Sequence, residues 1–509
     1  MTRRDARGLI VCVTGDEAKR IDHHAIEALG MASRALMEVA GQRAAEAILT
    51  RTGHQPGRGL VLCGPGNNGG DGYVVARVLQ EAGWTISCLA IKTPQADGGD
   101  AASNAQLFER LGGKVQVLSA CDLVELERLF HGKDLIVDAL LGVGLNKDLS
   151  GAMKDLVERA NAQQSALRVA LDVPTGFCAT KGRALGQSFR ADLTLTFGLF
   201  KLGLSQSGPE SLTGSCVTLP IGWPQTAIES ISPTWRMCDA SAVARALPAR
   251  KANAHKGTHG HTAIIGGRVG MEGAAVLSAL GAMRVGSGLT TWYCETSTSP
   301  VRRPPELMTR EFRSGLLATH NALLVGPGLG RGAYAREALD QALALETPLV
   351  LDADALNELA PLAAPLDAAT CVLTPHPGEA ARLLGCTSAD VEADRPKALE
   401  ELVRLSKSVV VLKGAGTLIG APGHPSVCVP GSAPALASGG TGDVLAGMIA
   451  GLLAQGLEPM AAAYAGAWLH LRAGQELGAL KAARGVLASE VADALPGLMN
   501  TIKTSWSAS

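Results

Sequence analysis

The sequence predicts an α/β fold with two domains, and two observations support this. Short β-branched runs alternate with helical segments from residue 59 to about 220, and a second series of the same kind follows residue 250. Strands separated by helices form parallel βαβ units, so each series predicts its own open sheet. A chain of 509 residues is also too long for one ordinary core.

The first series predicts a Rossmann-like, doubly wound sheet preceded by helices. Residues 15–50 carry an apolar stripe at helical spacing, with Leu36, Val39, Ala40 and Ala44 on it. Strands are expected at 60–63, 85–91, 135–142, 168–174, 193–198 and 216–220. In such sheets, ligands bind beyond the carboxyl ends of the strands.

The second series begins after an irregular, Pro-containing stretch at about 222–250, which indicates a domain junction. Strands are expected at 261–267, 288–294, 322–328, 348–354, 371–375 and 408–414. The run VLAGMIAGLLAQGL at 444–457 is shorter than a membrane span requires, so it predicts a buried helix.

Composition excludes several classes of protein. The 46 basic and 47 acidic residues nearly cancel, which disfavours nucleic acid and anionic membranes as partners. The 11 Cys residues include no C-x-x-C pair and no zinc spacing, so we expect reduced thiols and a cytoplasmic protein. Because the net charge is near zero, any phosphate site must be built from local groups.

The stretch GPGNNGGDG at 64–72 follows a predicted strand and opens a helix, and it contains the dinucleotide fingerprint G-x-G-x-x-G. The fingerprint expects an acidic residue at the end of the next strand, but that strand ends in Lys92. Asn67, Asn68 and Asp71 also add polar groups that a pyrophosphate turn does not need. The motif therefore indicates a nucleotide ligand but argues against an ordinary redox enzyme.

Two further strand ends in the first half carry polar clusters, DALLGVGLNKD at 138–148 and LDVPTG at 171–176. Together with NNGGDG they are expected at one edge of the parallel sheet, where their oxygens would suit a hard monovalent cation. Two structural explanations stay open. Asp and Asn beside Gly often form turns, and Asp138 or Asp172 could cap the following helix.

These motifs, with LMEVAG and LTFGLFKLGL, resemble the NAD(P)H-hydrate epimerase domain over roughly residues 10–225. The resemblance implies potassium ligands at Asn68, Asp138 and Thr175, and an acid/base at Asp172, with Lys201 as an alternative. It also implies a hydrate site, which besides Asp172 comprises Asn67, Asn68, Gly69, Gly70, Asp71, Gly142, Val143, Gly144, Leu145, Asn146, Lys147 and Asp148. Val143 stands where the family commonly has Thr, and Thr175 where it often has Ser.

The second half lacks a P-loop but contains ASGGTGDVLAG at 437–447. This predicts a glycine-rich turn at a helix N-terminus, which is an anion hole. Asp443 in that turn suggests a general base for a hydroxyl that attacks phosphorus. His376 between two prolines and Lys413 before Gly414 are candidate ligand contacts; a structural His and a surface hairpin are the alternatives.

Six ordered motifs, GGRVGMEGAA, GPGLG, LDADAL, TPHPGE, VLKGAGT and GGTGD, resemble the ribokinase-like ADP-dependent NAD(P)H-hydrate dehydratase over about 240–500. The resemblance implies hydrate contacts at Ala274, Gly330, His376 and Asp443. It implies adenine-nucleotide contacts at Lys413, Gly414, Ala415, Gly416, Thr417 and Gly442. GSAPALASGG is one residue longer than the family's usual segment, so the loop path before Ser438 is open.

We therefore expect a bifunctional repair enzyme with an epimerase domain at 1–225, a linker at 226–239 and a dehydratase domain at 240–509. Its expected ligands are the hydrated cofactors NADHX and NADPHX, together with ADP, K⁺ and Mg²⁺. We also expect a homo-oligomer. The rival hypotheses are a small-molecule kinase fused to a nucleotide-binding domain and a non-catalytic nucleotide sensor. The kinase would leave a stable phosphorylated product, and the sensor would bind without turnover.

Overall fold

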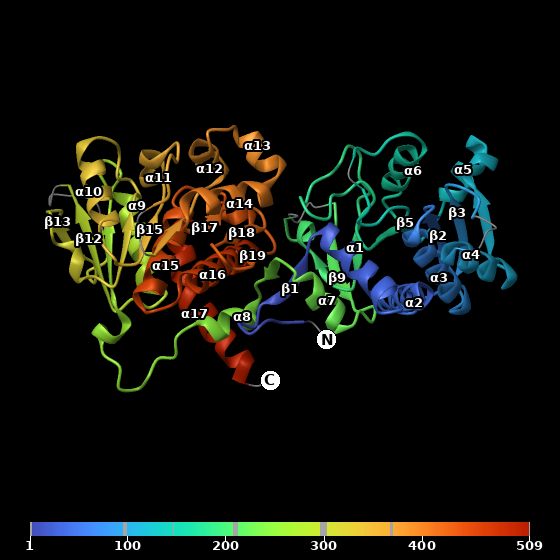
Figure 1. Cartoon of the computed structure of the whole chain (residues 1–509), viewed down its shortest axis with the longest axis horizontal. Helices are drawn as coiled ribbons and strands as arrows, with labels where there is room; N and C mark the ends of the chain where they lie inside the picture. The colour runs from blue at the N-terminus through green and yellow to red at the C-terminus, as the bar shows by residue number, and fades with distance from the viewer. Residues whose placement is uncertain are drawn as a thin grey trace. The chain divides into compact units, whose positions relative to one another are not determined.

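The computed structural model describes residues 3–94, 99–145, 147–206, 212–295, 303–366 and 370–507 (Figure 1). The chain forms two compact α/β units, as expected. The first unit comprises Val11–Trp235. The second comprises Arg236–Ser509 and also includes residues 3–10.

The first unit is built on a parallel seven-stranded sheet in the order β4-β3-β2-β5-β6-β7-β9. Its strands are β2 (Arg58–Cys63), β3 (Thr85–Ala90), β4 (Lys114–Val117), β5 (Leu135–Ala139), β6 (Leu167–Leu171), β7 (Leu193–Phe197) and β9 (Ser215–Leu219). All six strands expected from the sequence form. Edge strand β4 was not expected, because KVQV is only partly buried and lacks an apolar run. A short β1 (Ile10–Val13) pairs with β8 (Phe200–Lys201).

The helices of this unit are α1 (Gly15–His23), α2 (Ser33–Arg51), α3 (Asn67–Glu81), α4 (Asp100–Arg110), α5 (Leu123–Phe130), α6 (Gly151–Ala162) and α7 (Gln225–Ile231), with a π-helical turn η1 (His24–Ala28). The helices expected within 15–50 are confirmed. Leu36, Ala40 and Ala44 are buried, but Val39 is 37% exposed, so the expected apolar face was wrong at that position. Burial in α2 follows Met37 and Gly41 instead, on the other side of the stripe.

The strand order of this sheet reverses between β2 and β5. From β2 the chain moves outward through β3 to β4, and from β5 it moves outward through β6 and β7 in the opposite direction. The loops that leave two neighbouring strands then turn away from each other and open a crevice at their carboxyl ends. NNGGDG leaves β2 and Asp138 lies on β5, so both belong to this crevice.

The sheet of the second unit has the order β13-β12-β11-β14-β15-β16-β17-β18-β19. Its strands are β11 (His261–Ile265), β12 (Leu289–Cys294), β13 (Met308–Glu311), β14 (Ala322–Val325), β15 (Leu349–Leu351), β16 (Cys371–Leu373), β17 (Val409–Leu412), β18 (Thr417–Gly420) and β19 (Ser426–Val429); β10 (Trp235–Met237) lies at the boundary between the units. β13 through β17 are parallel, but β17, β18 and β19 form antiparallel hairpins. The all-parallel series therefore ends at the loop that contains Gly414 and Gly416.

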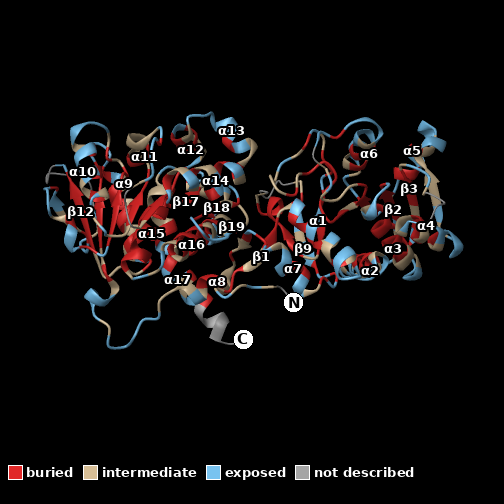
Figure 2. Cartoon of the chain, in the orientation of Figure 1, coloured by how far each residue is buried: buried red, intermediate tan, exposed pale blue. Residues whose placement is uncertain are grey.

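The helices of the second unit are α8 (Ala240–Ala246), α9 (Glu272–Arg284), α10 (Ala333–Leu343), α11 (Asp354–Leu359), α12 (Pro377–Leu384), α13 (Ser388–Ala393), α14 (Arg395–Ser406), α15 (Thr441–Ala454), α16 (Pro459–Leu480) and α17 (Ala488–Ser507). Helix α15 is buried along nearly its whole length, which confirms the prediction for 444–457 (Figure 2). Across the described chain, none of the helices combines the length and hydrophobicity that a membrane span requires.

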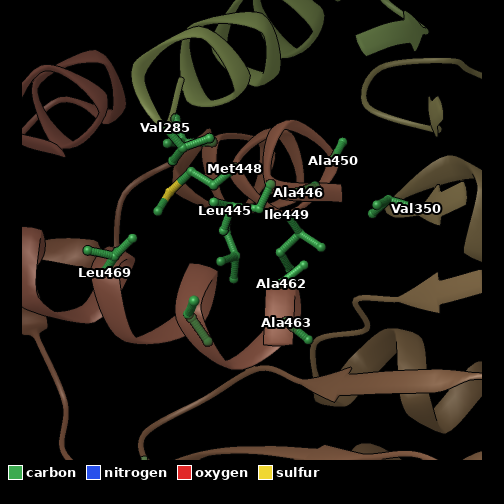
Figure 3. Close-up of a cluster of buried hydrophobic side chains, with 14 of the residues drawn as sticks. Val285, Val350, Leu445, Ala446, Met448, Ile449, Ala450, Ala462, Ala463 and Leu469 are labelled. Atoms are coloured by element: carbon green, nitrogen blue, oxygen red, sulfur yellow. The ribbon is translucent and has the colours of Figure 1, made fainter. Parts of the chain in front are cut away.

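Small residues let α15 pack closely at the centre of this unit. Leu445, Met448 and Ile449 belong to the hydrophobic cluster that also contains residues of α16 (Figure 3). On the α9 side, a Cβ at Gly447 would lie only 1.9 Å from the carbonyl oxygen of Ser278. The helix backbones therefore approach too closely for any larger side chain there.

Two neighbouring imidazoles at the start of the β11 and β14 strands predict an acid-labile second unit. The rings of His261 and His320 lie 4.2 Å apart. Burial lowers the pKa of both histidines. The charge of His320 adds to this effect at His261, whose pKa falls to about 4. Both imidazoles are therefore neutral in the folded protein. Their contribution to stability is complete above the unfolded pKa of about 6.5 and is lost as the pH falls towards 4.

We expect the urea midpoint of the second unit to be lower at pH 5 than at pH 7.5. This decrease should be smaller in a His261→Gln/His320→Gln variant. Exposed His424 supplies the control, because His424→Gln should leave the pH dependence unchanged. Equal losses in the double variant and the wild type would rule out the imidazole pair as the cause.

Candidate active sites

The stretch GPGNNGGDG forms the turn from β2 into α3. Gly69 is required there, because its Cβ would lie 2.0 Å from the carbonyl oxygen of Gly64. The close approach places the side chain of Asn68 inside the protein. Both amide atoms of Asn68 are buried and have no hydrogen-bond partner among the described residues. An unsatisfied buried polar group costs about 1–3 kcal/mol, so this amide is suited to a ligand.

Asp138 and Thr175 meet directly across the carboxyl ends of β5 and β6. The Asp138 carboxylate accepts hydrogen bonds from the Thr175 amide and hydroxyl, both at 2.7 Å, and from the Leu140 amide at 3.1 Å. Burial raises the pKa of Asp138 to about 6, although the bonds from Thr175 oppose the rise. The Thr175 hydroxyl also accepts from the Leu141 amide at 3.0 Å, which ties the following loop to this pair.

Asp172 directly follows β6 in the left-handed region, with a φ of 64°. One carboxylate oxygen lies 2.6 Å from Nζ of Lys201, and the other accepts from the Val143 amide at 3.3 Å. The side chain of Lys201 is only 2% exposed. A buried ion pair on a residue of unusual backbone conformation is typical of a functional site. Because Val143 makes this contact through its backbone, the bond does not depend on the side chain at that position.

Asn68, Asp172 and Lys201 line a cavity of about 370 Å³, whereas Asp138 and Thr175 are not among the residues of its wall. It is lined by the predicted residues Asn67, Asn68, Asp71, Gly142, Val143, Gly144, Asp172 and Lys201. A Cβ at Gly142 would lie 3.0 Å from the Asp172 carboxylate and 3.7 Å from Asn68, so the loop between them is tight. The structure does not place Gly69, Gly70, Leu145, Lys147 or Asp148 on the cavity wall, and Asn146 lies outside the described residues.

Asp22 and Trp223 are among the cavity residues that sequence reasoning missed. The indole of Trp223 donates to Asp22 at 3.1 Å, although 201 positions separate the two residues. Burial is the main cause that raises the pKa of Asp22 and that of Asp71, and the charge of Asp172 adds to both. No sequence signal could have found this pair, because Asp22 lies in the leading helix and Trp223 near the domain junction.

In the second unit the sheet order reverses between β11 and β14. The loops after these strands touch: the amide of Gly267 donates to the carbonyl of Pro327 at 2.9 Å, and that of Arg268 to Gly328 at 2.7 Å. Ala274 on α9 contacts this junction, and the amide of Gly330 donates to Asp354 at 2.8 Å. The predicted contacts Ala274 and Gly330 therefore lie at the switch point of the sheet.

Lys413 follows β17 and is held by carboxylates rather than left on the surface. Its Nζ lies 2.8 Å from Asp352 and 3.8 Å from Glu379. Burial opposes its charge, but Asp352 and Glu379 outweigh burial and raise the pKa of Lys413. A Cβ at Gly442 would lie 3.5 Å from this amine, so the glycine turn before α15 is adjacent. The remaining predicted nucleotide residues, Gly414, Ala415, Gly416 and Thr417, continue the same hairpin loop.

Asp443 lies in the first turn of α15. Burial, followed by the charge of Asp352, raises the pKa of Asp443 to about 7, while Lys413 opposes the rise. A carboxyl group that titrates near neutrality at a helix N-terminus is suited to general-base catalysis. The carboxylates of Asp352, Glu379 and Asp443 all act on Lys413, so an incoming phosphate would have to share its amine with them or replace them.

His376 caps the N-terminus of α12. Its Nδ1 accepts from the amides of Gly378 at 3.0 Å and Glu379 at 3.4 Å. These bonds place the ring proton on Nε2, so this nitrogen is the donor. His376 therefore has a structural role. Its half-exposed ring places Nε2 3.5 Å from a carboxylate oxygen of Glu379, so a ligand would share this nitrogen with Glu379.

Within the described residues, no group of three or more His, Cys, Asp or Glu side chains is arranged to hold a metal ion. All eleven cysteines are free thiols.

Fold and sites together define a two-domain α/β enzyme, with a buried lysine–carboxylate pair at strand ends of each sheet. Residues 262–497 match the family described as NAD(P)H-hydrate dehydratase, and residues 33–203 match the family described as YjeF-related protein N-terminus. Among solved structures, the ADP/ATP-dependent NAD(P)H-hydrate dehydratase from Bacillus subtilis is 33% identical, with a TM-score of 0.48, over 52% of this chain and 97% of that one.

Two curated relatives span almost the whole chain. The bifunctional NAD(P)H-hydrate repair enzyme Nnr of Moorella thermoacetica is 36% identical over 96% of this chain and 97% of its own length. The enzyme of the same name from Escherichia coli is 36% identical over 95% of this chain and 93% of its own. The chain belongs to the family of bifunctional NAD(P)H-hydrate repair enzymes.

Proposed function

We propose that this chain interconverts the R and S forms of NADHX and NADPHX, and dehydrates the S form with ADP to give NAD(P)H, AMP and phosphate. We assign epimerisation to residues 1–225 and dehydration to 240–509, with 226–239 as the linker. The observation that carries the proposal is the presence of two separate acid/base centres on one chain, Asp172 beside Lys201 and Asp443 beside Lys413. Full-length similarity to the repair family supports it.

Epimerisation requires that the hydroxyl-bearing carbon of the hydrated ring lose and regain water, or that the ring open and close. Either route needs a group that moves a proton at this position. Asp172 is the proposed acid/base, because its carboxylate lines the cavity and is held by Lys201 and the Val143 amide. The loops carrying Asn67 to Asp71 and Gly142 to Asp148 would surround the substrate.

Potassium is the proposed cation of the epimerase site, held by Asn68, Asp138 and Thr175. The fit rests on the unpartnered buried amide of Asn68, whose oxygen would complete an oxygen-only ligand set. Bound potassium would supply positive charge that fixes the loops around the substrate. Asp138 and Thr175 themselves position those loops through the Leu140 and Leu141 amides.

Replacing potassium with choline should slow epimerisation and lower the melting midpoint of the first unit. At about 100 times its Kd, potassium should raise that midpoint by roughly 5–10 °C. Asn68→Ala should remove the potassium response in both readouts and leave dehydratase activity unchanged. An undiminished potassium response in Asn68→Ala would exclude this residue as a ligand.

Dehydration would proceed through a phosphorylated hydrate. Asp443 takes the proton from the substrate hydroxyl, the oxygen attacks the β-phosphorus of ADP, and AMP leaves. Phosphate then leaves from the ring carbon as a proton is lost to solvent from the neighbouring ring carbon, and the double bond of the dihydronicotinamide ring re-forms. Phosphate is a far better leaving group than hydroxide. Lys413, Gly414, Ala415, Gly416, Thr417 and Gly442 would bind the nucleotide, and Ala274, Gly330 and His376 the hydrate.

A magnesium ion would neutralise charge on the nucleotide phosphates. Since the described residues hold no three-ligand metal cluster, the phosphates themselves would supply most of its ligands. From composition we propose that neither nucleic acid nor a membrane is a partner and that the chain acts in the reducing cytoplasm, which suits eleven free thiols. The homo-oligomer stays a prediction that composition does not address.

The deciding experiment incubates a mixture of both epimers of NADHX with ADP and follows the return of nicotinamide absorbance. We expect complete conversion, with one AMP and one phosphate released per NADH formed. A stable phosphorylated product would support the kinase alternative instead, and ADP binding without turnover would support the sensor. Parallel reactions with NADPHX, or with ATP, define the substrate preferences.

A further inference from the structure

Arg395 lies beneath the loop that connects β17 to β18, and among the described residues no carboxylate lies within hydrogen-bond distance of its charge. The residue is 6% exposed, at the start of α14. Its guanidinium donates to three carbonyl oxygens of the loop, those of Leu412 at 3.2 Å, Lys413 at 3.4 Å and Gly416 at 3.4 Å. Its buried Nε has no hydrogen-bond partner in the described part of the chain.

The contacts of Arg395 determine which way the loop's amides face. Lys413 and Gly416 turn their amides into the protein, donating to Pro375 at 2.9 Å and Gly431 at 2.8 Å. Gly414 and Ala415 at the tip are exposed, and their amides have no acceptor among the described residues. The guanidinium holds the Lys413 carbonyl inward, which turns the Gly414 N–H of the same peptide outward. The Ala415 N–H shares its peptide with the Gly414 carbonyl, which accepts from the Thr417 hydroxyl at 3.1 Å.

Gly414 and Arg395 are fitted to each other. A Cβ at position 414 would lie 2.1 Å from Nη1 of Arg395, and φ at this glycine is 147°. Only glycine allows the guanidinium to lie directly beneath the tip of the loop. The buried cation therefore lies directly beneath Gly414.

The charge balance indicates an anionic ligand. The nearest carboxylate, on Glu392, is 3.9 Å from Arg395 and has a half-exposed side chain. Lys413, by contrast, is neutralised by Asp352 at 2.8 Å. Burial lowers the pKa of Arg395, but a guanidinium still remains ionised. A buried and weakly compensated positive charge is costly alone and becomes favourable when an anion binds nearby.

We infer that Arg395 is the positioning residue of the nucleotide site: it orients the Gly414 amide and places positive charge beneath the loop, which attracts a phosphate of ADP. This inference rests on the proposed dehydratase function and concerns a residue outside the six predicted nucleotide contacts. Arg395 acts through the loop and does not touch the nucleotide.

Calorimetric titration of the full chain with ADP, and separately with adenosine, tests the inference. Arg395→Met should weaken ADP binding by about 10- to 100-fold and adenosine binding by no more than about twofold, because only the phosphate senses the loop. Arg395→Lys keeps the charge but not the three-way contact, so its ADP affinity should lie between those of Arg395→Met and the wild type. Arg404→Met, at an exposed ion pair on the same helix, is the matched control and should bind ADP normally.

A purely structural role would lower the melting midpoint while leaving the ratio of ADP to adenosine affinity unchanged, and that result would overturn the inference. The melting midpoint of the second unit, which contains Arg395, reports whether each variant is folded. If Arg395→Met fails to fold, the same affinity ratio is read from Arg395→Lys. A wild-type chain that neither binds nor turns over ADP would refute the proposed function. Normal ADP binding by both Arg395 variants would refute only this inference.

Discussion

Asp172→Ala should abolish epimerisation and destabilise the first unit. Loss of a general acid/base costs about 10²- to 10⁴-fold in rate. With dehydration intact, the mixed-epimer reaction should then stop once the S form is consumed. Removing Asp172 also leaves the amine of Lys201 buried and unpaired, which costs about 3–5 kcal/mol in free energy of unfolding. The conversion endpoint measures the loss of epimerisation, and urea denaturation measures the loss of stability.

The double variant Asp172→Ala/Lys201→Met separates catalysis from stability. With both charges removed, most of the lost stability should return, since an apolar side chain can replace a buried ion pair at little cost. Epimerisation should stay lost. Recovery of activity together with stability would mean that Asp172 serves only to neutralise Lys201.

Asp443→Asn should reduce dehydration by about 10²- to 10⁴-fold, while ADP binding and epimerisation persist. The amide retains the shape of the side chain but cannot accept the substrate proton. Asp340→Asn, an exposed substitution on α10, is the control and should be silent. Full dehydratase activity in Asp443→Asn would exclude Asp443 as the base.

The pH profile gives an independent check on the same carboxyl group. With a pKa of about 7, Asp443 should be inactive when protonated, so the rate should rise through neutrality as the pH increases. Asp352→Asn removes a negative neighbour that raises the pKa of Asp443. It also releases Lys413, whose positive charge lowers the pKa of Asp443. Both changes should shift the acid limb to lower pH.

Motifs next to buried strands could be predicted from the sequence because apolar runs locate strand ends. GPGNNGGDG, Asp138 and Asp172 were expected at one sheet edge, and the structure places Asn68, Asp71 and Asp172 on the wall of one cavity. The same logic located Asp443 at the start of α15 and Lys413 after β17. Local pattern was sufficient in these cases, since each residue is adjacent in sequence to the element that positions it.

Partnerships between distant segments could not be predicted. Asp22 and Trp223 meet from opposite ends of their unit, and Arg395 looks like an ordinary charged residue at the start of a surface helix. Its burial follows from the β17–β18 hairpin, which an all-parallel strand series does not reveal. The Asp352–Lys413 pair was also missed, because Lys413 was expected to contact a ligand and Asp352 was not singled out.

The first residues of the chain belong to the second unit, and this has a consequence for synthesis and for dissection. Arg4 bonds to Asp239 and Asp5 to Arg236, so residues 3–10 find their partners only after more than 200 further residues have left the ribosome. A fragment that begins at Arg236 would lack this segment. A dehydratase fragment that also carries residues 3–10, joined through a short linker or added as a peptide, should therefore be the more stable one.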